Sequence, residues 1–140
     1  MCEESNQEIE GKNKNISNRI LINGIEILFP FEPYIIQKKY MEKVIEFLNN
    51  KSTNEGYKGF AALESPTGTG KTLCLLCSVL AWFNKKKQEN KFKGKIIYAT
   101  RTHSQISQII SELKKTIYRP KIAILSSREF SCVNDNLKKK

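Results

Sequence analysis

The sequence lacks any hydrophobic run long enough to cross a membrane, since no stretch approaches about 18 consecutive apolar residues. It is also short of acidic charge: 14 Asp and Glu stand against 24 Lys and Arg, and the net charge is +10 with the single histidine neutral. The glutamates near the first residue give that end the wrong charge for a secretory or mitochondrial leader. We therefore expect no membrane, secreted or fibrous protein, and the basic balance favours a polyanionic partner.

Cysteine is scarce as well, and its spacing does not suggest a disulfide framework. Cys74 and Cys77 form a Cys-x-x-Cys pair inside an apolar run, which could belong to a redox or zinc site. No second metal-type pair exists to complete four ligands. Both residues are therefore expected to be small, buried helix residues.

The rest of the composition predicts one globular domain preceded by a polar arm. Hydrophobic residues make up 39% and charged residues 27% of the 140 residues, which is enough apolar content for a core. Residues 1–18 are rich in Asn, Glu, Lys and Ser without a hydrophobic period, which predicts a disordered arm. Residues 19–140 are expected to form the folded part.

Hydrophobic patterning predicts three helices and a set of short strands. Apolar residues recur at helical spacing over three stretches, at residues 34–48, 72–83 and 104–118. Short apolar runs bounded by turn residues predict buried strands at residues 59–64, 96–100 and 121–125. Residues 25–29 predict a further short strand or extended segment that ends at Pro30. Thr102 or Ser104 can cap the last helix.

The order of these elements predicts an α/β fold. Strands and helices alternate from residue 59 to residue 125, which is the pattern of a parallel sheet flanked by helices. The lysine-rich residues 84–95 are expected to form a surface loop, although their charge could also contact nucleic acid. No element is expected over residues 126–140. Such a small sheet has an open edge, so the chain is expected to be part of something larger.

Residues 65–72 carry the most informative motif, which matches Gly-x-x-x-x-Gly-Lys-[Ser/Thr] except that a serine replaces the first glycine. The two glycines let the backbone curl so that its amides point at phosphate oxygens, and the following helix adds its positive end. Lys71 is expected to reach the β- and γ-phosphates, and Thr72 to bind Mg²⁺; these two are the catalytic candidates. The expected nucleotide-binding residues of this loop are Ser65, Pro66, Thr67, Gly68, Thr69, Gly70, Lys71 and Thr72.

The alternative for this motif is a glycine-containing turn between strand and helix that binds no ligand. That alternative leaves the lysine and threonine at the helix start without a packing reason. A second candidate site follows the expected strand at residues 96–100, at the edge where open α/β sheets bind ligands. There Arg101 and Thr102 can each bind a phosphate, but a surface arginine and a capping threonine explain them equally well.

Taken together, these stretches resemble the iron–sulfur DNA helicases of superfamily 2, which are of the DEAH type. Within that group the sequence is most similar to the regulator-of-telomere-length helicases, with the Fanconi anaemia group J and xeroderma pigmentosum group D helicases as relatives. The resemblance runs from Asn23 to Cys132. It rests on separated motifs in the family's order, at residues 29–37, 63–77, 81–82, 100–105 and 125–132.

The resemblance implies a fold, an activity and residue roles. Residues 19–140 would be the N-terminal part of a RecA-like P-loop ATPase domain, ending where the iron–sulfur region starts. The whole enzyme would couple ATP hydrolysis to 5′–3′ movement on single-stranded or forked DNA, in genome maintenance in the nucleus. Gln37 would contact the adenine, Arg101 and Thr102 the DNA backbone, and Cys132 would be the first of four thiolates on a 4Fe–4S cluster.

The sequence departs from the family in what it lacks. It has no Asp-Glu-Ala-His motif, no further cluster cysteines after Cys132, and no second motor domain with its arginine finger. Arginine fingers are worth about 10³ to 10⁵ in rate. The alternatives are therefore a motorless nucleic-acid-binding or regulatory module that binds ATP without hydrolysing it, and a different P-loop ATPase, against which Gln37 and residues 100–105 argue.

Overall fold

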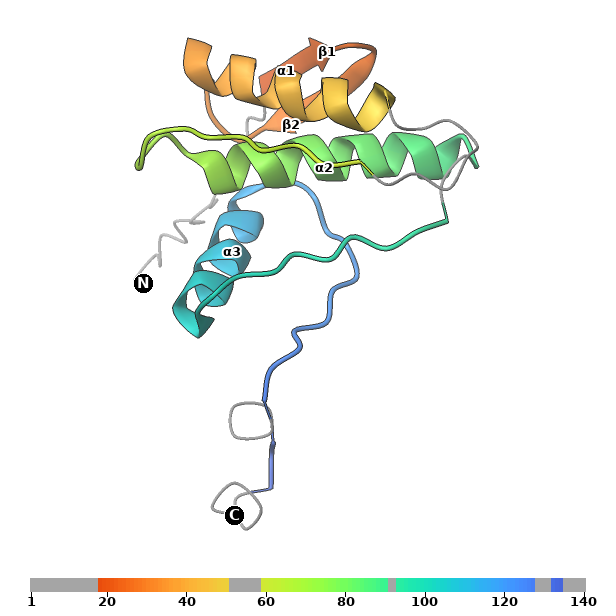
Figure 1. Ribbon diagram of the computed structural model, residues 1–140. Coiled ribbons are helices and arrows are strands. Elements are labelled where there is room, and N and C mark those ends of the chain that lie inside the picture. Colours follow the sequence, from red (N-terminus) through yellow and green to blue (C-terminus); the bar gives the residue numbers. More distant parts are fainter. Residues whose placement is uncertain (1–17, 51–58, 91–92, 128–131, 135–140) are drawn as a thin grey trace, which may run out of the picture.

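The computed structural model describes residues 18–50, 59–90, 93–127 and 132–134 (Figure 1). The expected arm at residues 1–18 lies outside these residues, apart from Asn18, which begins the first strand. In chain order the elements are β1 (Asn18–Ile22), β2 (Ile25–Phe29), α1 (Ile35–Asn50), α2 (Lys71–Gln88) and α3 (His103–Lys115). All three expected helices are thus present, together with the strand expected at residues 25–29.

β1 and β2 form an antiparallel hairpin, with Asn18 opposite Phe29 and Ile22 opposite Ile25. The two residues between the strands, Asn23 and Gly24, have positive φ angles of 46° and 77°. Positive φ at both positions gives a type I′ turn, whose twist matches that of the strands. β1 was not predicted from the sequence, although Asn-Gly between two apolar runs is a strong hairpin signal.

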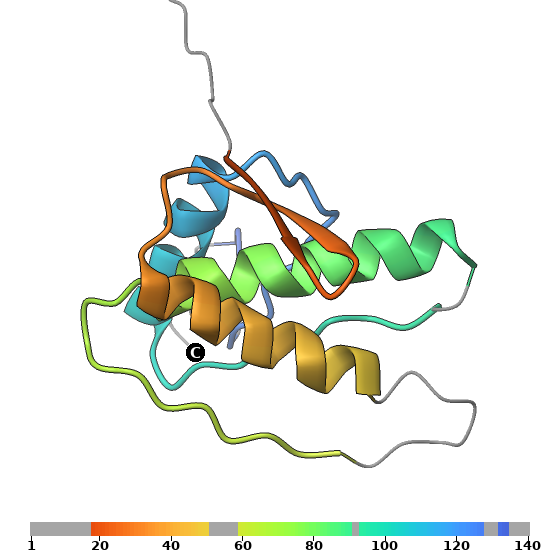
Figure 2. The ribbon, with the colours of Figure 1, turned by 90° about the horizontal axis from the view of Figure 1, so that it is seen from above.

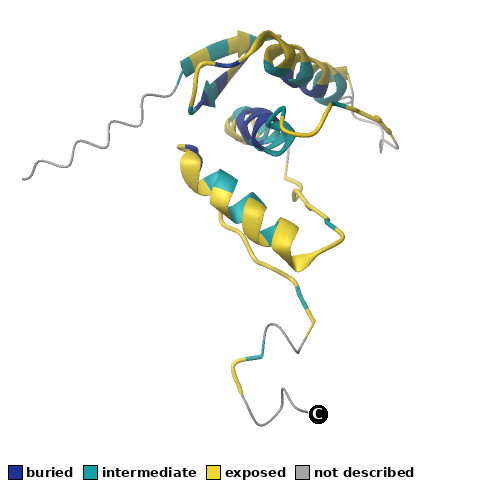
Figure 3. Cartoon of the chain, turned by 90° about the vertical axis from the view of Figure 1, so that its left-hand side faces the viewer, coloured by how far each residue is buried: buried dark blue, intermediate teal, exposed yellow. Residues whose placement is uncertain are grey.

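The core lies around α2, which is the central element of the molecule. α1 and the hairpin pack on one side of α2, and α3 lies on the other side (Figures 1 and 2). α2 has buried residues from Leu73 to Trp82, whereas α3 has no buried residue (Figure 3). The largest fully buried side chains come from the hairpin, α1, α2 and the segment after α3: Ile25, Ile27, Phe29, Met41, Ile45, Cys74, Cys77, Ser78 and Thr116.

The prediction of buried helix cysteines is confirmed. Cys74 and Cys77 are 1% and 0% exposed in α2. Burial raises the pKa of the Cys74 thiol to about 11 and that of Cys77 to about 12. Both are therefore protonated near neutral pH and act as small hydrophobic residues rather than as nucleophiles or metal ligands.

The expected parallel sheet is not formed in this structure. Residues 59–64, 96–100 and 121–125 are extended but unpaired, and the hairpin is the only sheet among the described residues. Side chains on these segments stay in solvent; Ile97 is 88% and Leu125 is 89% exposed. Parallel strands are stable when both faces of the sheet are covered and neighbours supply the backbone partners. The architecture shown is therefore α/β in the coarse sense only.

Two helix boundaries also differ from the expectation. α2 continues to Gln88, so residues 84–88 are helix and not loop. Its last turn carries Lys85, Lys86 and Lys87, and positive charge there complements the helix dipole. α3 ends at Lys115 rather than at residue 118, because Thr116 adopts an extended conformation with φ −87° and ψ 170°.

Candidate functional site

The expected loop between residues 65 and 70 is present and leads directly into α2. Gly68 and Gly70 have φ angles of 81° and 78°, in the left-handed region that favours glycine. Gly70 is the N-cap of α2 and provides no side-chain cap for the first turn. The first-turn amides of α2 therefore keep their capacity to bind an anion.

The side chain of Lys71 folds back over the loop. Its Nζ donates to the backbone oxygens of Ser65 and Pro66, at 2.6 Å each. These neutral acceptors hold the cation at the loop that the sequence predicts to carry phosphate. An anionic phosphate oxygen is a stronger partner for an ammonium group than a carbonyl, so the lysine is placed to exchange one for the other.

Gln37 joins the first turn of α1 to this loop. Its Oε1 accepts a bond from the Tyr34 backbone N–H, and its Nε2 donates to the Thr69 carbonyl, both at 3.0 Å. A Cβ at Gly70 would lie 2.8 Å from Gln37 Nε2, which is too close. The structure thus brings Gln37 to the loop, where its side-chain amide is hydrogen-bonded to the loop backbone.

The hydroxyl groups of the loop bond to one another. Ser65 Oγ lies 2.7 Å from Thr69 Oγ1, and Thr69 Oγ1 donates to the Pro66 carbonyl at 2.8 Å. Thr72 is the second residue of α2 and is half-buried. Curled glycines, an α2 N-terminus without a side-chain cap and a lysine held at the loop together fit the phosphates of a nucleotide.

Arg101 and Thr102 are exposed at the start of α3. Thr102 is the N-cap and forms a capping box with Gln105, which settles the choice between Thr102 and Ser104. Gln105 Oε1 accepts bonds from the backbone N–H groups of Arg101 and Thr102 at 3.2 and 3.3 Å. The capping role is confirmed, and contact with DNA remains a prediction.

Cys132 stands apart from the other described cysteines. Its thiol donates to the Asn134 carbonyl, with sulfur and oxygen 3.6 Å apart. In the part of the chain that the structure describes, no three His, Cys, Asp or Glu residues are grouped to hold a metal ion. A 4Fe–4S cluster needs four ligands, so these residues do not fit it.

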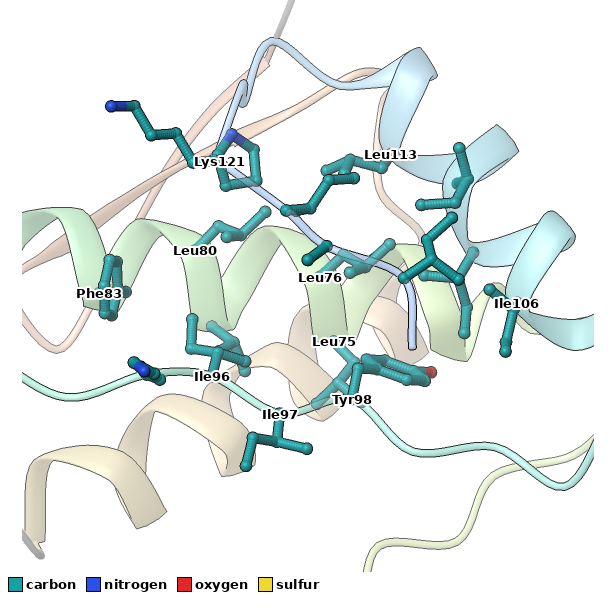
Figure 4. Close-up of a pocket in the computed structure, with 18 of the residues that line it drawn as sticks. Leu75, Leu76, Leu80, Phe83, Ile96, Ile97, Tyr98, Ile106, Leu113 and Lys121 are labelled. Carbon is teal, nitrogen blue, oxygen red and sulfur yellow. The ribbon is translucent and has the colours of Figure 1, made fainter. Parts of the chain in front are cut away.

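An apolar groove of about 700 Å³ opens beside α2, on the side that faces α3 (Figure 4). Its walls are α2, α3 and the extended residues 94–98 and 120–125, with Leu76, Leu80, Ile96, Tyr98, Ile106 and Leu113 among its lining. The apolar side chains of α3 face this open groove, so none of them is fully buried.

No helix in the described ranges is both long and apolar enough to span a bilayer.

Comparisons with known proteins show that the chain is similar to helicases. A DEAD_2 family model matches residues 98–140. Regulator of telomere elongation helicase 1 of Mus musculus and of Homo sapiens are each 40% identical to this chain over 157 residues, covering 86% of the chain. The homolog of Arabidopsis thaliana is 43% identical over 143 residues, covering 83% of this chain.

The chain spans only 12–13% of the length of these relatives. No solved structure matches it. The expected resemblance to helicases is thus confirmed over most of the chain. Over most of its length, the chain is thus similar to the helicases named regulator of telomere elongation helicase 1.

Proposed function

We propose that the chain is the N-terminal, nucleotide-binding part of an ATP-dependent DNA helicase of genome maintenance. The observation that carries this proposal is the loop at residues 65–70, with its two left-handed glycines, the α2 N-terminus behind it and Lys71 folded over it. The names of the relatives, as telomere elongation helicases, support the same activity and a place in the nucleus.

In this function, Lys71 leaves the carbonyls of Ser65 and Pro66 and binds the β- and γ-phosphates. The backbone N–H groups of residues 67–72 would surround the phosphates, and the Thr72 hydroxyl would hold Mg²⁺. When bound, Mg²⁺ neutralises charge on the transferred phosphate. Gln37, already placed at the loop, contacts the adenine.

Arg101 and Thr102 are proposed to bind the backbone of single-stranded or forked DNA. The capping box supports this role, because it fixes the start of α3 and leaves the Arg101 side chain in solvent. In the whole helicase, translocation in the 5′–3′ direction would rely on an acidic motif and a second motor domain that are not among these 140 residues. The chain alone is therefore proposed to bind ATP but to hydrolyse it poorly.

The parallel RecA-like sheet is proposed to form in the apolar groove. Residues 59–64, 96–100 and 121–125 are already extended, and α2 and α3 line the groove with apolar side chains. Further strands of a longer polypeptide would provide the missing backbone partners.

No step of the proposed function depends on a 4Fe–4S cluster, because the described residues offer only Cys132 toward it.

Titration of the 140-residue chain with a fluorescent ATP analogue and Mg²⁺ tests the proposal. The wild-type chain should bind weakly, and Lys71→Ala should weaken binding at least tenfold. Lys87→Ala removes the same charge at the opposite end of α2 and should bind like the wild type. Equal affinity of Lys71→Ala and wild type would rule out the loop as the phosphate site.

The second candidate is a motorless module that binds nucleic acid without needing ATP. The net charge of +10 favours it. Its signature is DNA binding that falls steeply with salt and does not change when Mg-ATP is added. Under the helicase proposal, binding of single-stranded DNA depends on Arg101 and responds to nucleotide.

A further inference from the structure

Thr69 is held at three points by the residues around it. Its Oγ1 contacts Ser65 Oγ at 2.7 Å and the Pro66 carbonyl at 2.8 Å, and its own carbonyl accepts a bond from Gln37 Nε2 at 3.0 Å. Two of these partners belong to the loop, and the third comes from α1. The residue in the middle of the phosphate loop is therefore fixed through its side chain and its backbone.

The direction of the hydroxyl bonds follows from counting protons. A threonine hydroxyl has one proton, and a carbonyl oxygen can only accept. The Thr69 hydroxyl therefore donates its proton to the Pro66 carbonyl, so the Ser65 hydroxyl is the donor to Thr69 Oγ1. The chain of bonds runs from Ser65 through Thr69 to Pro66. A glycine at position 65, as in the strict motif, has no hydroxyl to start this chain.

The position of Thr69 explains how these bonds can restrict the loop. Thr69 lies between Gly68 and Gly70, the two residues of the loop with left-handed backbones. Glycine is the most permissive residue of the backbone and loses the most conformational freedom on ordering. Holding the residue between two glycines restricts both of them, so the loop keeps one shape before any ligand arrives.

We propose that Thr69 is the positioning residue of the phosphate loop, and that Ser65 and Gln37 hold it in place so that the loop is ordered before nucleotide binds. The inference rests on the proposed function of this loop. Ser65 is then a functional replacement for glycine and not a neutral one. Preorganisation raises affinity because less entropy is lost on binding.

The test measures binding of a fluorescent ATP analogue with Mg²⁺ by the 140-residue chain. Thr69→Val keeps the side-chain shape but removes the hydroxyl, and Ser65→Ala removes the donor. Each should weaken binding by about 3- to 10-fold, which corresponds to one hydrogen bond. Because both belong to one chain of bonds, the double variant should lose no more than the worse single variant.

Two further variants separate positioning from folding. Thr69→Ser keeps the hydroxyl and should bind within about twofold of the wild type. Ser107→Ala removes a hydroxyl that donates to a backbone carbonyl on α3 and should change nothing. Thermal unfolding of each variant shows whether a loss of affinity is accompanied by a loss of structure.

The outcomes are distinct. Full wild-type affinity in Ser65→Ala, or strictly additive losses in the double variant, overturns the positioning role and leaves the proposed function intact. Absence of nucleotide binding by the wild-type chain overturns the proposed function and the inference with it. Coupled losses with an unchanged unfolding temperature, and recovery in Thr69→Ser, support the inference.

Discussion

The phenol oxygen of Tyr118 accepts a hydrogen bond from the backbone N–H of Leu28 at 3.0 Å. The two residues are 90 positions apart, and this bond ties the segment after α3 to the second strand of the hairpin. Tyr118 is only 7% exposed, and burial raises its pKa to about 12. One side chain thus links the hairpin to the segment after α3, and both of these pack in the same core as α2.

Tyr118→Phe should destabilise the chain while leaving its shape unchanged. The substitution removes only the phenol oxygen, so the Leu28 N–H is left without its acceptor in a part-buried position. An unsatisfied group of this kind costs about 1–3 kcal/mol. Urea unfolding followed by circular dichroism measures the loss. Tyr34→Phe, at an exposed tyrosine, is the matched control, and equal stability of both variants would refute the importance of the bond.

The chain should lose stability at alkaline pH. Burial raises the pKa of Cys74 from 9.0 to about 11, of Cys77 from 9.0 to about 12, and of Tyr118 from 10.0 to about 12. The folded state therefore holds these protons longer than the unfolded state. Stability is full below pH 9 and declines as pH rises from 9 to 12.

The measurement is the free energy of unfolding in urea at several pH values above 8. Cys77→Ala should make the decline with pH shallower, whatever its effect on absolute stability. Cys132→Ala, outside the core, should leave the slope as in the wild type. A flat profile up to pH 11 would show that these groups are not buried as described.

Gly70→Ala should cost more than Gly68→Ala. Both positions are left-handed, which costs a non-glycine residue about 1–2 kcal/mol. At Gly68 a Cβ meets nothing within 4 Å, whereas at Gly70 it lies 2.8 Å from Gln37 Nε2. Chemical denaturation of the two variants should therefore rank them. Adding Gln37→Ala to Gly70→Ala should recover part of the difference, and no recovery would contradict the contact.

Gln105→Ala should loosen the start of α3. The variant removes the acceptor for two backbone N–H groups, those of Arg101 and Thr102. Loss of a capping interaction costs about 0.5–2 kcal/mol. Amide hydrogen exchange should speed up in the first turn of α3 only. Gln108→Ala changes an exposed residue of the same helix and should not affect it, while Gln105→Glu keeps the acceptor and should retain protection.

The helices and the glycine-containing loop at residues 65–70 could be predicted from the sequence because neighbouring residues decide them. Helical spacing located α1, α2 and α3, and the glycines at 68 and 70 marked the loop. The end of α2 was placed too early, since three consecutive lysines suggest a loop, yet the helix dipole favours them in a last turn. The pattern over residues 18–22 does not predict β1, because its alternation is weak; the Asn-Gly turn that follows is the signal that indicates a hairpin.

The sequence by itself determined the local features: the helix-forming stretches, a polar residue able to cap α3, and the glycine-containing loop at residues 65–70. Only the tertiary structure decided which distant residues meet. Gln37 reaches Thr69 across 32 positions and Tyr118 reaches Leu28 across 90. It also decided that the extended segments stay unpaired. Contacts of this range depend on the packing of everything between their partners, and strand pairing depends on neighbours that a local pattern does not reveal.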